Sequence, residues 1–458
     1  MPGAPGRYRT QHALSPEHTA MKSPPTPYWR LTLLLLTLRA LPALAHGGLP
    51  ETSNLSIRRG SSEDFISGST FGAIISRDHG QTWRWLCPEG MGIGAWRPER
   101  YFWLTGGQLL AATGSALIRS SDGACTWNTH AFFKDTWVTN LAVHPTNERI
   151  MYVTTGKPSA ANGVYRSDDG GETWRAVSTL SPDLRYSAIR IAPSDPQRIY
   201  ASGQNTEGML FLDRSDDGGQ TWTRLPQPLP QFQRPYDLIL LQVSEASADV
   251  LWGRVSGYDP IQQGSFSYLL KSSDGGTTLT AVMHTADVIV SAEASADGHT
   301  VWVSTPVHMY RGLGDEAFTE LSLPNGNACA LRVGSLLYGC GSNWVHDWAL
   351  GLSHDEGTTW EPIVGLSHIQ GSHICPAGTP VQELCPSRWP QLAVVLGAPT
   401  YDYGDGGVDS PPDAGTSDPG EPPTKKGCST TTGLIPSAIL LLTLTLARRS
   451  RRGPSPRT

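Results

Sequence analysis

Charged side chains are scarce in this chain: Asp, Glu, Lys and Arg make up 17% of its 458 residues, against about a quarter in an average soluble protein. The formal net charge is −6, and no cluster of Lys or Arg lies between residues 46 and 398. Nucleic acid is therefore not an expected partner, because binding it requires a basic surface. Cys-x-x-Cys pairs are also missing, although a structural zinc site would usually show them.

Glycine (49 residues) and proline (36 residues) are abundant instead, a balance that indicates an all-β protein with many turns. Six copies of one pattern, Ser-x-Asp-x-Gly-x-Thr-Trp, start 44, 47, 48, 57 and 81 residues apart. Repetition at such a period predicts a repeat architecture. The second copy has Ala124 at the usual Gly position, and the fifth ends in Leu279. The copies begin at Ser76, Ser120, Ser167, Ser215, Ser272 and Ser353.

Residue chemistry explains why this pattern can recur. Asp and Ser side chains bond the amides of their own turn, and Gly supplies a positive φ at low cost. The Trp is a large apolar group that can fill the space between neighbouring units. We therefore predict a structural role, and neither catalysis nor metal binding, for the main residues of the pattern: Asp78, Asp122, Asp169, Asp217, Asp274, Asp355, Trp83, Trp127, Trp174, Trp222 and Trp360.

The pattern resembles the Asp-box, or BNR, repeat of sialidases, sortilin-type receptors and the photosystem II assembly factor. This resemblance implies a β-propeller, an architecture shared with WD40-like and YVTN-like repeats. It leaves the activity open, because one fold supports many unrelated functions.

The spacing gives the number of blades. The 81-residue gap is nearly two periods, and residues 307–321 inside it repeat the frame of residues 163–177: a strand, a Gly/Asp turn and an aromatic-led strand. Counting this degenerate copy gives seven units of about 50 residues. Short apolar strands precede several boxes, for example at 140–143 and 150–153, so each unit has four strands. We predict one all-β domain at residues 46–398, a single seven-bladed β-propeller of four-stranded blades.

Two alternatives remain for the closure of the ring. Blade one is complete in itself, with strands expected at 55–58, 64–67 and 72–75 before its box. The late apolar run 392–396 could be an extra strand that latches blade seven to blade one, or it could cap the last blade.

The first 45 residues predict export. Residues 1–20 are polar and Pro-rich, whereas Met21, the expected start, opens a signal-peptide pattern with an apolar core at 31–38 and a cleavage site before His46. A mature chain that starts at His46 could chelate copper through its amine and imidazole, but nothing else resembles a copper monooxygenase. No metal and no other cofactor is therefore predicted.

Six of the seven cysteines lie in the predicted exported domain, where an even number predicts disulfides. His368 and His373 stand near two of them, and disulfides with surface histidines explain this segment better than a metal site. Fifteen pairings are open, and proximity in the sequence favours Cys87–Cys125, Cys329–Cys340 and Cys375–Cys385.

The C-terminal part predicts attachment to the cell envelope. Residues 399–426 are rich in Pro, Gly and Asp and too polar to fold, which predicts a disordered stalk. Cys428, the apolar run 434–447 and an Arg cluster follow. Together they resemble the MYXO-CTERM sorting signal of myxobacterial surface proteins, which implies a role for Cys428 in processing and anchoring. An ordinary membrane anchor at 427–458 is the alternative.

A catalytic site is harder to find. Sialidases carry an early Arg-Ile-Pro motif, which this chain lacks, and arginines that grip a carboxylate. Four early charges are the candidate catalytic residues, although a solvated blade edge also explains them: Arg58, Arg59, Glu63 and Asp64. Glycoside hydrolysis would need two facing carboxylates. No Tyr–Glu arrangement stands out among Tyr186, Tyr236, Tyr258 and Tyr268.

Trp344 and Trp348 lie in a loop-like stretch before the last box, and an exposed aromatic pair there would suit a sugar or a peptide. The sequence thus predicts a non-enzymatic, surface-anchored propeller that binds a protein or glycan or serves envelope assembly. An exo-sialidase-like or other glycoside hydrolase is the alternative. Arg and acid side chains that converge at the central funnel would favour the enzyme, and a broad apolar or charged face would favour the binder.

Overall fold

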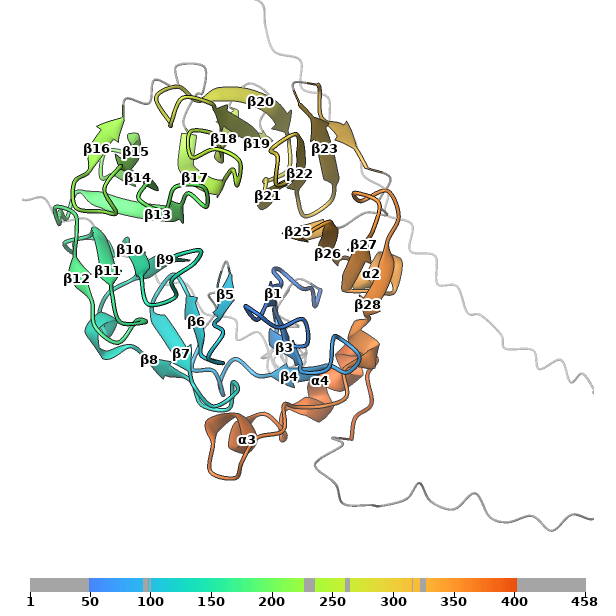
Figure 1. Cartoon of the computed structure of the whole chain (residues 1–458). Coiled ribbons are helices and arrows are strands. Elements are labelled where there is room, and N and C mark those ends of the chain that lie inside the picture. The colour runs from blue at the N-terminus through green and yellow to red at the C-terminus, as the bar shows by residue number, and fades with distance from the viewer. Residues whose placement is uncertain are drawn as a thin grey trace, which may run out of the picture. The chain divides into compact units, whose positions relative to one another are not determined.

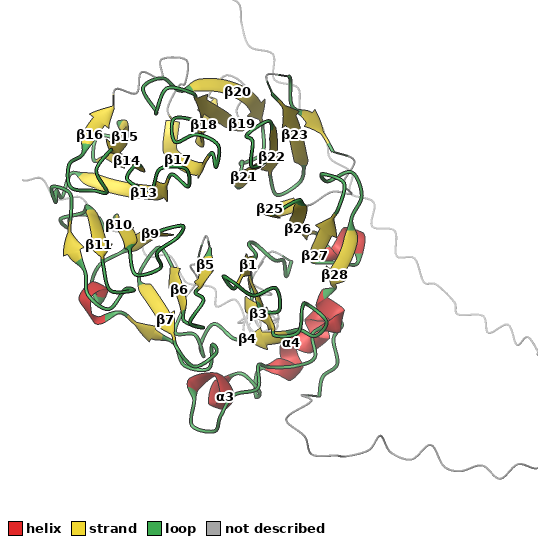
Figure 2. Cartoon of the chain, viewed as in Figure 1, coloured by secondary structure: helices red, strands yellow, loops and turns green. Residues whose placement is uncertain are grey.

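A computed structural model describes residues 49–93, 98, 100–225, 235–259, 264–314, 316–321 and 327–401. In this part of the chain, 28 strands form seven sheets of four antiparallel strands, arranged as blades around a central axis (Figure 1; Figure 2). The predicted seven-bladed all-β propeller is confirmed. No described helix is long and apolar enough to cross a membrane. The predicted signal peptide, His46, Cys428 and the apolar run 434–447 lie outside the described residues.

Each blade is built from four consecutive strands, with the first nearest the axis (Figure 1). Blade one contains β1 (Ser56–Ile57), β2 (Phe65–Ser69), β3 (Gly72–Ser76) and β4 (Arg84–Leu86). Blade two contains β5 (Tyr101–Trp103), β6 (Leu109–Ala112), β7 (Leu117–Ser120) and β8 (Asn128–Thr129). Blade three contains β9 (Val138–Val143), β10 (Met151–Thr155), β11 (Val164–Ser167) and β12 (Arg175–Ala176). Blade four contains β13 (Leu184–Ile191), β14 (Ile199–Asn205), β15 (Leu210–Ser215) and β16 (Thr223–Leu225).

The degenerate copy supplies two strands of blade six, as predicted. Blade five contains β17 (Pro235–Val243), β18 (Leu251–Asp259), β19 (Gly264–Ser272) and β20 (Thr280–Thr285). Blade six contains β21 (Ser291–Ala294), β22 (Thr300–Ser304), β23 (Met309–Leu313) and β24 (Thr319–Glu320). Blade seven contains β25 (Asn327–Val333), β26 (Leu336–Gly341), β27 (Leu350–Ser353) and β28 (Glu361–Val364). The helices are η1 (Ala131–Phe133), α2 (Asn343–His346), η2 (Leu366–His368), α3 (Pro380–Leu384) and α4 (Trp389–Leu396).

The boxes are turns between the third and fourth strands, and hydrogen bonds from their own side chains hold these turns in shape. In the third box, Ser167 Oγ donates to Asp169 Oδ1 (2.7 Å) and accepts from the Gly171 amide (2.8 Å). Asp169 also accepts from the hydroxyl (2.5 Å) and the amide (2.9 Å) of Thr173. These hydrogen bonds hold the pKa of Asp169 well below its usual range. The box carboxylates are therefore engaged in their own turns.

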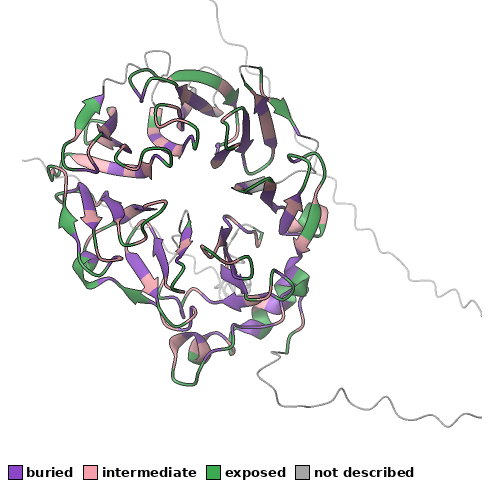
Figure 3. Ribbon diagram, viewed as in Figure 1, coloured by how far each residue is buried: buried purple, intermediate pink, exposed green. Residues whose placement is uncertain are grey.

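The turns of every blade fall on two faces of the ring. The Gly170 amide of the third box donates to Arg149 O (2.8 Å), in the turn between the first two strands, and the same contact occurs in blades one, four, five and six. This side is named the box face. On the other side, the turns between second and third strands meet the links between blades, as where the Thr70 amide donates to Glu51 O (2.8 Å). This side is named the opposite face. Figure 3 shows the buried residues along the inner strands of the blades and the exposed ones in the connections and the outermost strands.

The ring closes without a shared blade. In the described residues, no sheet mixes strands from the two ends of the domain. Residues 366–398, the closing segment, instead run along the outer edge of blade one (Figure 1). Trp85 N donates to Gly371 O (2.8 Å) and His373 N donates to Trp85 O (2.7 Å), which places a short parallel bridge outside β4.

Of the two alternatives for residues 392–396, the latching strand is wrong, because this run belongs to α4. Its buried residues Trp389, Ala393 and Leu396 recur at helical spacing, whereas Val394 and Val395 are 70% and 54% exposed. The ring of Trp389 packs on Trp85 at 5.9 Å between centroids. The run therefore covers blade one as a helix.

Of the three predicted disulfides, Cys329–Cys340 is confirmed and the other two are wrong. The closing segment instead forms Cys87–Cys385 and Cys125–Cys375, with Cα atoms 5.3 and 5.5 Å apart. Proximity in the sequence misled here, because a ring brings its first and last parts together. The two bonds fasten the closing segment to blades one and two.

Candidate functional site: the central channel

Three of the four candidate catalytic residues have side-chain partners at the edge of blade one. Asp64 accepts from Arg58 Nη1 (2.9 Å) and from Arg77 Nε (2.5 Å). Glu63 is largely exposed and lies 3.5 Å from His79 Nε2. The two carboxyl groups are thus engaged in separate pairs in the box-face turns, and they do not converge with the arginines on one ligand position.

Arg59, the fourth candidate, reaches the central channel. Its guanidinium donates to His144 O (2.9 Å) and Val143 O (3.3 Å), at the end of β9 in blade three. It also lines a cavity of about 200 Å³ at the box-face end of the channel, together with Arg100 and Arg190. Arg59 therefore connects blades one and three across the intervening blade.

Other channel arginines also act as clamps between blades. Arg190 on β13 donates from Nε to Leu241 O on β17 (2.9 Å). Arg332 on β25 donates from Nε to Ala294 O on β21 (2.6 Å), and its Nη2 pairs with Glu245 at 2.5 Å. These guanidinium groups are occupied by carbonyl and carboxylate partners within the ring.

Arg100 differs from these clamps. It precedes β5 in blade two, and its Nη2 lies 3.5 Å from Glu293 Oε1 on β21 of blade six, across the channel. The side chain of Arg100 is 51% exposed, whereas that of Glu293 is 11% exposed. Both residues line a cavity of about 710 Å³. Burial raises the pKa of Glu293 to about 7, despite the opposing charges of Arg100 and Arg332.

This larger cavity opens toward the opposite face. Its wall includes Leu49 and residues 51–55 ahead of β1, Thr70 in the β2–β3 turn and Pro306 in the β22–β23 turn. Sequence reasoning missed the site, because Arg100 and Glu293 are 193 residues apart and belong to no motif. One signal was available: Glu293 is the charged residue within an otherwise small, uncharged strand, Ser291–Ala294.

The predicted aromatic pair is not exposed as a pair. Trp348 is 6% exposed and stacks on Trp360 at 6.0 Å between centroids. Trp344, in α2, is 39% exposed and donates from Nε1 to Pro50 O (2.9 Å). Trp348 therefore belongs to the core of blade seven, and Trp344 alone is available at the opposite face.

A buried tyrosine–carboxylate contact does occur, within blade four. Tyr186 Oη donates to Asp213 Oδ2 (2.9 Å), and Arg224 holds the same carboxylate from Nε (2.8 Å) and Nη2 (3.0 Å). Burial raises the pKa of Tyr186, so the phenol remains a neutral donor. The group joins β13, β15 and β16, which is a structural role.

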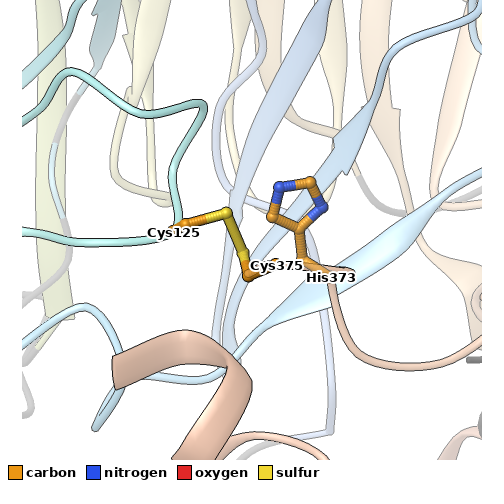
Figure 4. Close-up of side chains that lie close together, drawn as sticks. All are labelled: Cys125, His373 and Cys375. Carbon is orange, nitrogen blue, oxygen red and sulfur yellow. A yellow bond between two sulfur atoms is a disulfide. The ribbon is translucent and has the colours of Figure 1, made fainter. Parts of the chain in front are cut away.

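One cluster has the residue types of a metal site: Cys125, His373 and Cys375 (Figure 4). Both sulfur atoms are joined in a disulfide, so neither is a thiolate ligand. His373 Nε2 lies 2.9 Å from Gly123 O, and burial lowers the pKa of its imidazole. The cluster fastens the closing segment to blade two.

The blades and their box turns together define an Asp-box β-propeller, and comparisons with known proteins agree. A sequence profile described as the BNR/Asp-box repeat matches residues 165–176. No curated protein matches the chain.

Similar solved structures come from proteins of different roles. They include an ancestral GH74 enzyme (13% identity, TM-score 0.49, covering 69% of this chain and 44% of that one) and YCF48 from Cyanidioschyzon merolae (14%, 0.43, 66% and 94%). The extracellular domain of a hybrid two component system from B. thetaiotaomicron is a third (13%, 0.46, 67% and 38%). The chain spans less than half of the GH74 enzyme's length. With identities of 13–14% and TM-scores below 0.5, these likenesses support no conclusion about the role of this chain.

Proposed function

We propose that this chain is an exported, envelope-attached binding module whose ligand enters the central channel from the opposite face. The observation that carries this proposal is the cavity of about 710 Å³ at that end, with the charged pair Arg100–Glu293 in its wall. Three disulfides support export, because such bonds persist in oxidising compartments. Attachment through Cys428 and the apolar run 434–447 is part of the same proposal.

Exposed apolar side chains around the blades support binding at this face. Exposed apolar surface commonly marks sites of interaction. The opposite-face connections carry many of the exposed large apolar residues: Leu49, Phe132, Trp137, Leu180, Met209, Val288, Val307, Trp344 and Val345. In the described turns of the box face, by contrast, the boxes present polar groups bonded to one another. A partner would therefore gain more by covering the opposite face.

A glycoside hydrolase is the second candidate, and Glu293 is the observation that favours it. A carboxyl group with a pKa of about 7 suits a general acid at neutral pH. The mechanism also needs a second carboxylate, and Glu51 lines the same cavity. However, the described wall of the cavity contains no aromatic side chain, which sugar sites commonly use. We therefore favour binding without turnover.

The test is to incubate the purified full chain with arrays of sialylated, plant and bacterial glycans and to measure both retention and released sugar. We expect no released product from wild-type protein or from Glu293→Gln. Release that Glu293→Gln abolishes, while Asp169→Asn in a box turn retains it, would establish the hydrolase and overturn the binding proposal.

A further inference from the structure

The guanidinium of Arg100 has more N–H donors than it has good acceptors in the described part of the protein. A guanidinium carries five N–H donors, and the hydrogen bond of Arg100 to Glu293, at 3.5 Å, is at the limit of such a bond. Arg332 is the contrast, with a 9% exposed side chain and donors held by Ala294, Gly334 and Glu245. Arg100 is half exposed and lines the channel cavities at both ends. Its free donors therefore face the space that a ligand would fill.

The rest of the large cavity combines aliphatic side chains with polar ones. Its described wall lacks aromatic rings, and besides Arg100 and Glu293 it includes the charged residues Glu51 and Arg254 and several hydroxyl and amide groups. Such a surface offers burial to an aliphatic group but no ring for a sugar to stack on. The aliphatic wall residues are Leu49, Leu55, Leu241, Val290, Ala292, Pro306 and Ala330.

We propose that the channel binds a ligand whose aliphatic group ends in a carboxylate, with Arg100 as the anchor and Glu293 as the group that the ligand displaces. The inference rests on the proposed function, because it names the ligand class of the same cavity. A planar guanidinium suits a carboxylate, since two parallel N–H groups can meet two oxygens.

Glu293 makes this binding depend on pH. The charged groups that act on it are Arg100 ahead of β5, Arg190 on β13, Arg332 on β25 and Glu245 after β17, and Glu51 ahead of β1 and Arg254 on β18 line the same cavity. When Glu293 is protonated, it leaves Arg100 to the ligand and can donate its own proton to a ligand oxygen. When it is ionised, it competes for Arg100 and repels the incoming carboxylate. Because its pKa is about 7, binding weakens as the pH rises through neutrality.

Calorimetric titration of the full chain with octanoate, at about pH 6 and about pH 8.5, tests the inference. We expect wild-type protein to bind on the order of tenfold more tightly at the lower pH. Glu293→Gln should bind equally at both, and Arg100→Gln should lose at least about tenfold at both. Arg100→Lys, which keeps the charge, should recover part of the loss. Arg175→Gln, which removes a 60% exposed arginine on the outer strand β12, is the matched control and should behave as wild type.

Two further ligands, an alcohol and a short peptide, show which part of the ligand the channel recognises. Octanol tests whether the carboxylate matters, and a tripeptide Ala-Leu-Val with a free or an amidated C-terminus tests whether a peptide end can supply it. Equal binding of octanol and octanoate, or full affinity in Arg100→Gln, would overturn the inference and leave the binding function standing. Sugar release in the glycan assay would instead overturn the binding function itself.

Discussion

The two faces of the ring are built from the same blades but differ in chemistry. On the box face, charged groups find partners within the protein, as in the pairs Arg166–Asp168 (2.5 Å) and Arg214–Asp216 (3.1 Å). On the opposite face, large apolar side chains such as Phe132 and Met209 are 52% and 60% exposed. One face therefore satisfies its own groups, whereas the other leaves surface that a partner could cover.

The repeated box and the central channel have different roles in the molecule. The box recurs with the same internal hydrogen bonds in blade after blade, for example at Ser167 and Ser215. The pair Arg100–Glu293 occurs once and joins two distant blades. The repeated boxes thus build the ring, and single residues on or next to the inner strands give the channel its specific chemistry.

The largest effect should come from opening the ring on which both faces depend. Replacing Cys87, Cys125, Cys375 and Cys385 by serine removes crosslinks that span 298 and 250 residues, whereas Cys329–Cys340 spans 11. Because longer loops lose more entropy on crosslinking, we expect a stability loss of at least about 5 kcal/mol for the four-fold variant and roughly 3 kcal/mol for Cys329→Ser with Cys340→Ser. Urea unfolding measures both, and equal losses would contradict the closing role of the segment.

Replacing Glu293 by Gln should change how stability depends on pH. The folded pKa of about 7 lies above the ordinary value of 4.5, so the folded state holds more protons between these values. Wild-type stability should therefore fall as the pH rises from about 4.5 to about 7, by up to ~3 kcal/mol. Glu293→Gln should remove this decline. Urea midpoints at several pH values check it, and parallel profiles for the two proteins would show that Glu293 is not a buried acid.

A pair of substitutions compares the faces directly. Asp169→Asn weakens hydrogen bonds of a box turn and should lower Tm by roughly 2–4 °C without changing octanoate binding. Met209→Ser, on the opposite face, should leave Tm within about 1 °C because its side chain is exposed. Differential scanning calorimetry measures both. A larger loss for Met209→Ser would reverse the assignment of the two faces.

The smallest effect should come from the irregular second box. Ala124 has φ 76°, a conformation that favours glycine. Ala124→Gly should stabilise the protein by about 0.5–1 kcal/mol, and Gly171→Ala at φ 87° in the third box should destabilise it by a similar or larger amount. Urea unfolding again provides the measurement. Destabilisation by Ala124→Gly would mean that packing of the methyl group outweighs the backbone strain.

Local patterns in the sequence predicted the ring well. Box turns depend on neighbouring residues, so their spacing predicted seven blades, including the degenerate copy at 307–321. The strand expected at 140–143 falls within β9, and the one expected at 150–153 falls within β10 except for its first residue, because short apolar runs between turn residues form strands.

Features that depend on distant residues could not be predicted. The run 392–396 is apolar enough for a strand or a buried helix, and only its packing on blade one through Trp389 decides between them. Cys87 and Cys385 meet because the ring returns to its start. Arg100 and Glu293 meet across the channel for the same reason, so no local pattern marks them as a site.

Hydrogen exchange with and without octanoate, at about pH 6, tests the central claim most directly, because it reports on both faces in one experiment. The account predicts slower exchange in the channel strands β5 and β21 and in residues 49–55, with the box turns at 167–174 and 215–222 unchanged. Protection of the box turns without protection of the channel would contradict it.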